Sequence, residues 1–352
     1  MNAKILIDAE RMRYPNTGLY NFCKYLGNEI LNQNKSFDIE LFMPGNETSN
    51  FRNLDNHVDR RFWHKFFMPF QNNYSLWHTT FQNTKFFPDS FKGKIAYTIH
   101  DLNFLHEKHS DSKRQSYLDA VANRIHRADR VITISNYVKN EVLEHIDVRP
   151  EKIEVIYNGC NLLNTGYVVT VPKNIPSKPF IYSIGNLCEK KNFHVLAGML
   201  LNNDFELVIS GINANNGYLE KILSYARSLG VENRIIFTGV VSDEEKHWYL
   251  ANCLAFGFTS IAEGFGLPVI EAMYFGKPVF LSTRTSLPEI GGSLAYYFDN
   301  FDPQYMASQT ERGLADFYTN PSKSIAVKEY VKKFSWNNAA EQYLELYKRL
   351  LD

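Results

Sequence analysis

The chain has 352 residues and a formal net charge of zero, with 38 basic and 38 acidic residues. At about 150 residues per domain, this length predicts two domains, and the balanced charge excludes the global basic field of a nucleic-acid binder. The four cysteines lie far apart without a C-x-x-C pair, which argues against a disulfide framework or a zinc site and favours a reducing compartment. No apolar run is long enough for a signal peptide or a membrane span, so we expect a cytoplasmic protein.

Short apolar runs alternate with helical patterns through the first half of the chain. The predicted strands are 4–8, 39–43, 76–78, 95–99, 130–134 and 153–156, and the predicted helices are 18–32, 111–127 and 136–144. Strands that alternate with helices indicate parallel βαβ units. The proline-containing stretch 162–178 interrupts this rhythm and predicts an interdomain connection.

The same alternation resumes in the second half. Here the predicted strands are 180–184, 206–209, 235–237, 254–258, 278–281 and 295–298, and the predicted helices include 219–229, 267–275 and a final amphipathic helix at 336–351. We therefore predict an α/β fold with two Rossmann-like parallel-sheet domains that face each other across a cleft. Ligands of such sheets bind at the carboxyl ends of the strands.

The stretch 259–276 carries two glutamates eight residues apart, Glu263 and Glu271, around a predicted turn. Glycines in a turn let backbone N–H groups approach a ligand, and the start of the following helix favours anions. By spacing alone, a strand–turn–helix with two exposed glutamates is an equally good interpretation. The turn and the first helical residue are Gly264, Phe265, Gly266 and Leu267.

This stretch resembles the E-x7-E signature of retaining glycosyltransferases of the GT-B fold, specifically glycosyltransferase family 4. The resemblance covers nearly the whole chain, and four further segments resemble motifs of that family in the same order: 128–135 (ADRVITIS), 155–159 (VIYNG), 183–192 (SIGNLCEKKN) and 334–336 (FSW). The resemblance implies an acceptor-side domain at 1–165, which the C-terminal helix 336–352 joins, and a nucleotide-sugar-binding domain at 176–330.

Lys190 and Lys191 follow the predicted strand 180–184, where two ammonium groups would suit a diphosphate. A solvated lysine pair is the alternative, and the resemblance favours the diphosphate. Many members of the family carry an arginine directly after the glycine of this loop, where this chain has Asn186. We therefore expect the two lysines to take a larger part in binding the phosphates.

His100 and Asp101 follow the predicted strand 95–99, so His100 could donate to a sugar hydroxyl or contact the reacting centre, while Asp101 orients its ring. A structural His-Asp pair is the alternative, but the resemblance implies an active-site position near the transferred sugar. It also implies that Thr17 and Gly18 contact the donor phosphate and the acceptor, and that the backbone near Val241 contacts the nucleotide base.

The resemblance implies a retaining, metal-independent transfer from a nucleotide diphosphate sugar to a glycan or lipid-linked acceptor hydroxyl. No D-x-D motif occurs, and no cofactor, metal or nucleic acid is expected. Glu263 would bind hydroxyls of the donor sugar and Glu271 those of the ribose. GDP-mannose is the first choice of donor and a UDP-sugar the second, in bacterial surface polysaccharide synthesis such as that of lipopolysaccharide. The alternatives are a GT-B epimerase or phosphorylase, and a non-catalytic two-domain module that binds sugar nucleotides.

The segment 60–67 (RRFWHKFF) mixes cations with aromatic residues. One interpretation is an amphipathic helix whose aromatic side chains enter the first core. The other is contact with an anionic membrane or a lipid-linked acceptor, which would make the protein peripheral at the inner face of the membrane.

Overall fold

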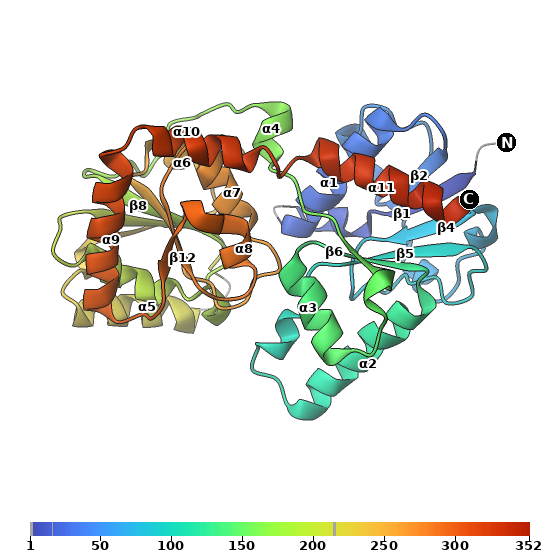
Figure 1. The fold of residues 1–352 in the computed structure, drawn as a ribbon, viewed down its shortest axis with the longest axis horizontal. Helices are drawn as coiled ribbons and strands as arrows, with labels where there is room; N and C mark the ends of the chain where they lie inside the picture. Colours follow the sequence, from blue (N-terminus) through green and yellow to red (C-terminus); the bar gives the residue numbers. More distant parts are fainter. Residues whose placement is uncertain (1–2, 16, 214–215) are drawn as a thin grey trace. The chain divides into compact units, whose positions relative to one another are not determined.

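The computed structural model describes residues 3–15, 17–213 and 216–352 (Figure 1). The chain divides into two compact units, of which unit 1 is Met1–Asn164 with Phe334–Asp352 and unit 2 is Thr165–Lys333. The predicted domains were 1–165 with 336–352, and 176–330. Among the described residues, none of the helices has the length and apolarity needed to cross a membrane.

Unit 1 is built on a seven-stranded sheet in the order β3-β2-β1-β4-β5-β6-β7, with every pair parallel. Parallel sheets are covered on both faces, which explains why their strands read as short, nearly continuous apolar runs. The strands are β1 (Lys4–Asp8), β2 (Asp38–Met43), β3 (His57–Asp59), β4 (Leu76–Thr79), β5 (Lys94–Ile99), β6 (Arg130–Thr133) and β7 (Ile153–Val155).

Helices cover both faces of this sheet. Helices α1 (Gly18–Gln33) and α11 (Trp336–Leu351) lie beside each other and bury one face, which includes Ile5 (Figure 1). Leu6 points the opposite way, into a core shared with α2 (Asp111–Arg127) and α3 (Asn136–His145). The apolar stripe that predicts α11 therefore packs within unit 1.

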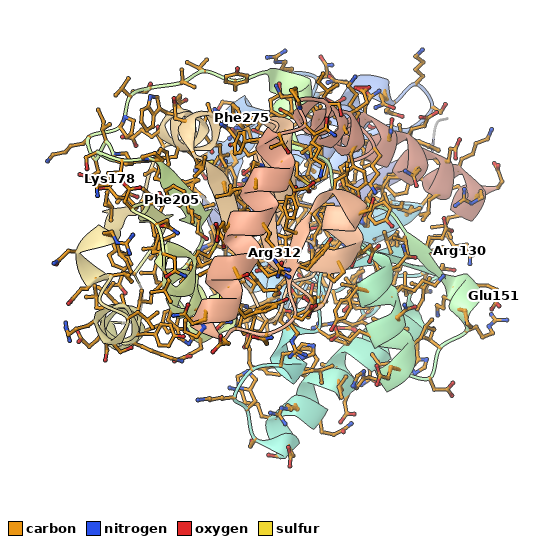
Figure 2. The ribbon with its side chains drawn as sticks, turned by 60° about the vertical axis from the view of Figure 1, so that its left-hand side comes forward. Arg130, Glu151, Lys178, Phe205, Phe275 and Arg312 are labelled. Carbon is orange, nitrogen blue, oxygen red and sulfur yellow. The ribbon has the colours of Figure 1, made fainter. Side chains whose placement is uncertain are left out.

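Unit 2 repeats this plan on a six-stranded parallel sheet in the order β10-β9-β8-β11-β12-β13. Lys178 and Phe205 lie just before β8 and β9 and mark the amino edge of the sheet (Figure 2). The loops that leave the opposite, carboxyl edge carry the predicted donor residues. The strands are β8 (Phe180–Ile184), β9 (Glu206–Ser210), β10 (Ile235–Gly239), β11 (Ala255–Phe258), β12 (Val279–Ser282) and β13 (Tyr296–Phe298).

The helices of unit 2 form two groups. One group packs together with a run of 3-10 turns at Phe193–Leu200 and contains α5 (Asn216–Ser228) and α9 (Pro303–Tyr318). The other group contains α6 (Asp243–Asn252), α7 (Leu267–Tyr274) and α10 (Ser322–Val331). A further helix of unit 2, α8 (Leu287–Gly291), is a single turn, as is α4 (Asn161–Thr165) at the boundary between the two units.

The predicted α/β architecture with two parallel-sheet domains is confirmed, and each predicted strand matches an observed strand within a few residues. The edge strand β3 was not predicted, because His57–Asp59 is short and mostly exposed. The interpretation of 60–67 as an amphipathic helix that buries its aromatic residues is wrong. This segment contains only a 3-10 turn, Phe62–Lys65, in which His64 is the buried residue.

Candidate active site

Two glycines bring the loops after β8 and β9 together in unit 2. Gly185 and Gly211 both have positive φ angles, 153° and 143°. A Cβ atom built on Gly211 would lie 1.9 Å from the carbonyl oxygen of Gly185, so only glycine fits there. The first loop then turns through Asn192 at φ 56°, a left-handed conformation that asparagine tolerates. This path positions the preceding Lys191 at the carboxyl edge of the sheet.

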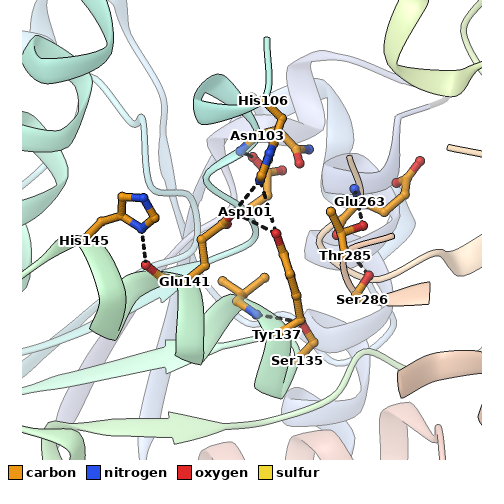
Figure 3. A network of polar contacts seen from close by, with 11 residues as sticks. Asp101, Asn103, His106, Ser135, Tyr137, Glu141, His145, Glu263, Thr285 and Ser286 are labelled. Atoms are coloured by element: carbon orange, nitrogen blue, oxygen red, sulfur yellow. Dashed lines mark hydrogen bonds and ion pairs between the residues drawn. The ribbon is translucent and has the colours of Figure 1, made fainter. Parts of the chain in front are cut away.

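The Glu263 turn is fixed by the loop that follows β12. The hydroxyl of Ser286 donates to the carbonyl oxygens of Glu263 and Phe265, each at 3.0 Å. The Glu263 N–H donates to Thr285 Oγ1 at 3.1 Å (Figure 3). Thr285 has φ 54°, which is strained for a β-branched residue. Gly266, at φ 104°, is the N-cap residue directly before α7.

Lys191 and Glu263 form an ion pair in unit 2. The Lys191 Nζ lies 2.5 Å from Glu263 Oε1, and the two side chains are 17% and 14% exposed. The ammonium also lies 4.9 Å from the centre of the Phe258 ring. Lys191 is therefore not a solvated surface lysine, which contradicts that alternative for this residue. Lys190 is half-buried beside it, and its carbonyl accepts the Ile261 N–H at 2.8 Å.

Glu271 lies within α7 and is buried, so the alternative of two exposed glutamates is wrong. Its Oε1 lies 3.1 Å from the Nζ of Lys246 on α6, which also contacts Asp243 at 2.9 Å. Burial alone would lower the pKa of Lys246, but the carboxylates of Glu271 and Asp243 overcome this effect and raise it. Sequence reasoning missed Lys246, because the run DEEK at 243–246 resembles a solvated helix face.

The remaining donor candidates lie on the same loops of unit 2. Gly264, Phe265 and Gly266 are buried, and Leu267 is half-buried as the first residue of α7. Val241 is half-buried between β10 and α6. The structure therefore gathers these candidates with the lysines and glutamates on the loops and following helices at one edge of the sheet.

His100 of unit 1 is buried at the end of β5, where its Nε2 lies 2.8 Å from the carbonyl oxygen of Thr80. A carbonyl only accepts, so Nε2 carries the proton and Nδ1 is an acceptor while the ring is neutral. Burial lowers the pKa of His100 to about 4, the carbonyl of Thr80 raises it, and the charge of Arg11 lowers it. The neutral ring therefore has no second proton to donate to a sugar hydroxyl, which corrects the role predicted from the sequence.

The Nε2 of His100 is hydrogen-bonded to the carbonyl oxygen of Thr80 and not to Asp101. The Asp101 Oδ1 accepts from the backbone N–H of Asn103 at 3.1 Å and from the amide of Gln82 at 3.4 Å. The Gln82 side chain in turn accepts the backbone N–H of His100 at 3.1 Å. Asp101 therefore orients the backbone around His100 through Gln82.

Thr17 and Gly18 begin α1 in unit 1. The Thr17 hydroxyl accepts the Tyr20 N–H at 3.2 Å, so this residue caps the helix without any ligand. No heavy atom lies within 4 Å of a Cβ built on Gly18. The loop 11–18 contains residue 16, which lies outside the described residues.

Asp8, at the end of β1, is a buried carboxyl that sequence reasoning missed. Burial raises its pKa to about 7, although the Glu10 N–H and the Thr84 hydroxyl donate to it at 2.9 and 3.2 Å. Its position at the carboxyl end of the predicted strand 4–8 could have marked Asp8 as a candidate site residue.

A second missed cluster lies on α3 and the loop after β5 (Figure 3). Glu141 is buried, and its Oε1 lies 2.5 Å from His106 Nε2 and accepts from the Tyr137 hydroxyl at 2.9 Å. Burial and the charge of Glu141 raise the pKa of Tyr137. Within the described ranges, no group of three or more His, Cys, Asp or Glu residues could hold a metal ion.

Comparison with known proteins matches both halves of the chain to glycosyltransferase families. Residues 43–162 match the model described as Glycosyltransferase Family 4, and residues 171–334 match the model described as Glycosyl transferases group 1. The serotype-specific mannosyltransferase WbdA of Escherichia coli is 30% identical over 75% of this chain and 34% of its own length. The chain thus spans about a third of that relative. The O-antigen chain mannosyltransferase B of Escherichia coli is 25% identical over 72% of this chain and 70% of its own length.

Solved structures match the whole fold at low sequence identity. The sucrose-phosphate synthase of Thermosynechococcus elongatus matches with a TM-score of 0.77 and 18% identity, covering 99% of both chains. Anabaena HepE, solved in complex with UDP-glucose, matches with a TM-score of 0.77 and 19% identity, covering 98% of this chain and 99% of its own. From the two family models and these shared architectures we conclude that the chain belongs to the family 4 glycosyltransferases of the GT-B fold.

Proposed function

We propose that this protein transfers a sugar from a nucleotide diphosphate sugar to a hydroxyl of a glycan or lipid-linked acceptor, with retention of anomeric configuration. GDP-mannose is the proposed donor, with a UDP-sugar as the second candidate, and bacterial surface polysaccharide is the proposed product. The relatives named as O-antigen and serotype-specific mannosyltransferases support this choice. A cytoplasmic reaction without a resident metal or cofactor is part of the proposal.

The observation that carries the proposal is the pairing of both glutamates of the E-x7-E stretch with buried or half-buried lysines. Lys191 pairs with Glu263, and Lys246 pairs with Glu271. Each carboxylate is therefore held in place and charged, ready to accept hydrogen bonds from hydroxyl groups. We assign Glu263 to the hydroxyls of the transferred sugar and Glu271 to those of the ribose.

In the proposed reaction, the acceptor oxygen bonds to the anomeric carbon on the face from which the diphosphate leaves. The bond between that carbon and the diphosphate oxygen breaks, and a diphosphate oxygen takes the acceptor's proton. Lys190, Lys191 and the start of α7, with the turn 264–266 before it and Leu267 as its first residue, would neutralise the leaving group. Since Lys191 already contacts Glu263, a bound diphosphate must share or replace that contact.

The unit 1 candidates and Val241 have smaller roles in this proposal. The backbone at Val241 would contact the nucleotide base. Neutral His100 would accept, through Nδ1, a hydrogen bond from a hydroxyl of the transferred sugar, with Asp101 holding the surrounding backbone. Thr17 and Gly18 would approach the donor phosphate or the acceptor.

The test measures release of nucleoside diphosphate from a panel of GDP- and UDP-sugars, with and without acceptor glycans. We expect turnover with GDP-mannose, and the proposal fails if no sugar nucleotide is turned over although one binds. Lys191→Ala should weaken GDP binding by one charge-assisted contact, about 1.5–3 kcal/mol, or roughly tenfold to a hundredfold. Guanosine binding should not change, and Lys332→Ala, at an exposed position on the chain segment after α10, is the matched control.

The two glutamates should differ in kinetics. An interaction that strengthens only in the transition state affects kcat, whereas uniform binding affects KM. Glu263→Gln should lower kcat by about 10²–10³-fold without weakening product GDP. Glu271→Gln should mainly raise the donor KM and weaken GDP, which keeps the ribose. The reverse pattern in a GDP titration would exchange the two assignments.

A further inference from the structure

A short segment of unit 1, Arg61–Phe67, exposes most of its apolar surface. Phe62, Phe66 and Phe67 are 69%, 78% and 65% exposed, and Trp63 is 37% exposed. The other large hydrophobic residue of unit 1 that is exposed among the described residues is Tyr14. Contiguous exposed apolar groups of this kind mark contact surfaces, because monomeric proteins otherwise avoid them.

Two buried residues within and after the segment fix it to the protein. The His64 ring is buried against Phe42 and Phe70, with centroid distances of 5.6 and 5.0 Å, and Met68 is also buried. The His64 Nδ1 accepts the backbone N–H of Arg61 at 3.1 Å. The aromatic side chains on either side of His64 are therefore held outward by a folded 3-10 turn.

Cations alternate with these aromatic rings. Arg61 and Lys65 are exposed within the segment, and the Lys65 Nζ lies 4.7 Å from the centre of the Phe66 ring. The preceding Arg60 turns back toward the protein, where its Nε lies 3.7 Å from Glu10. No acidic residue occurs between Arg60 and Phe67, so the surface is both apolar and positively charged.

Exposed aromatic rings together with cations fit an anionic bilayer better than they fit another protein. A protein core would match the rings but would have to desolvate the two cations, which is costly without paired acids. The boundary of an anionic bilayer accepts both, since tryptophan and phenylalanine lie at the acyl boundary while arginine and lysine reach the lipid phosphates. Each cation near such a surface strengthens binding further.

We propose that Arg61–Phe67 docks this protein on an anionic phospholipid bilayer, with the aromatic side chains inserted and Arg61 and Lys65 at the phosphates. The proposal concerns binding alone and does not depend on the transfer reaction. A failed vesicle assay would therefore leave the proposed activity untouched, and an inactive enzyme would leave the docking untouched.

The test is flotation of the full chain with vesicles of phosphatidylcholine alone or with about a third phosphatidylglycerol. We expect binding to the anionic vesicles and at least tenfold weaker binding to neutral ones. The triple variant Phe62→Ser/Phe66→Ser/Phe67→Ser should lose at least tenfold in partitioning, and so should Arg61→Glu/Lys65→Glu. The matched control, Val168→Ser/Val171→Ser/Ile325→Ser, removes three side chains of similar exposure from unit 2 and should bind as the parent does.

Fluorescence gives a second readout at the segment itself. Trp77 and Trp336 are fully buried, and Trp248 is half-buried in unit 2, away from the segment in the sequence. A vesicle-dependent blue shift and quenching by brominated lipids should therefore come from Trp63 and vanish in Trp63→Phe, where Trp248 is unchanged. Equal partitioning of the triple variant and the parent would overturn the proposal. Equal binding to neutral and anionic vesicles would overturn the assigned lipid charge. Self-association that the triple variant abolishes, without vesicle binding, would assign the surface to a second copy of the chain instead.

Discussion

Replacing Lys246 by methionine removes the cation that faces Glu271. At an effective dielectric constant of about 20, unit charges at the observed 3.1 Å attract by roughly 5 kcal/mol. The side chains are 11% and 7% exposed, so Glu271 would remain as a buried carboxylate without this counter-charge. We therefore expect Lys246→Met to destabilise unit 2 by about 3–5 kcal/mol.

The variant Glu271→Gln should destabilise unit 2 less than Lys246→Met does. In Glu271→Gln, Lys246 keeps Asp243 at 2.9 Å, and Asp243 lies near solvent at 66% exposure. The double variant Lys246→Met/Glu271→Gln removes both buried charges and should lie within about 1 kcal/mol of the parent, since an apolar replacement for a buried pair is often neutral. A double-mutant cycle should therefore give a coupling of about 2 kcal/mol or more.

The assay is guanidinium unfolding followed at unit 2 alone. Trp248 is the single tryptophan between residues 165 and 333, so fluorine NMR of the fluorotryptophan-labelled chain separates this unit from the other. The control is Lys221→Met, whose ion pair with Glu189 spans 2.6 Å with side chains 43% and 55% exposed, and which should cost less than about 1 kcal/mol. If Lys246→Met costs no more than Lys221→Met, the buried pair is not the electrostatic unit described above.

Two further predictions concern stability. The pKa of Asp8 is raised from 3.8 to about 7, so the native state binds the extra proton between these values and stability falls as pH rises through this window. Asp8→Asn should therefore gain up to about 3 kcal/mol relative to the parent between pH 5 and 7 in urea unfolding, while a pH-independent difference would contradict this. Gly211→Ala should cost more than about 2 kcal/mol by thermal unfolding, because its Cβ would lie 1.9 Å from the Gly185 carbonyl oxygen. Gly18→Ala, at an open position, should change stability by less than about 1 kcal/mol, and similar losses in both variants would refute the steric argument.

Much of the fold follows from local patterns in the sequence. The predicted and observed bounds agree fully for β1, α2 and α11, because buried parallel strands give apolar runs and amphipathic helices give a stripe of apolar residues. Edge strand β3 gives no such signal, since its residues are mostly exposed. The exposure of the aromatic residues at 62–67 could not be predicted either, because the residue types do not show which side chains of a short turn point to solvent.

The candidate site was predicted less completely than the fold. The sequence located Glu263, Glu271 and Lys191, but neither Lys246 nor the two ion pairs, since these contacts join residues 72 and 25 positions apart. The tautomer of His100 likewise depends on the carbonyl of Thr80, which lies 20 positions away, directly after strand β4. Pairings of this kind arise from tertiary structure, and spacing along the chain does not encode them.

Unit 1 is assembled from two stretches of chain that are made at different times. A ribosome adding 5–20 residues per second needs roughly 10–30 s to produce residues 165–333 after the first stretch is complete. In the folded protein, Gly159 packs so closely against Trp336 that a Cβ would lie 2.3 Å from the Trp336 backbone nitrogen. During that interval Trp336 has not been made, so this contact is missing. Unit 2 is continuous and can fold first. Stalled or truncated chains that end directly after Lys333 should therefore carry a complete second unit and a first unit whose apolar face binds chaperones or other nascent chains.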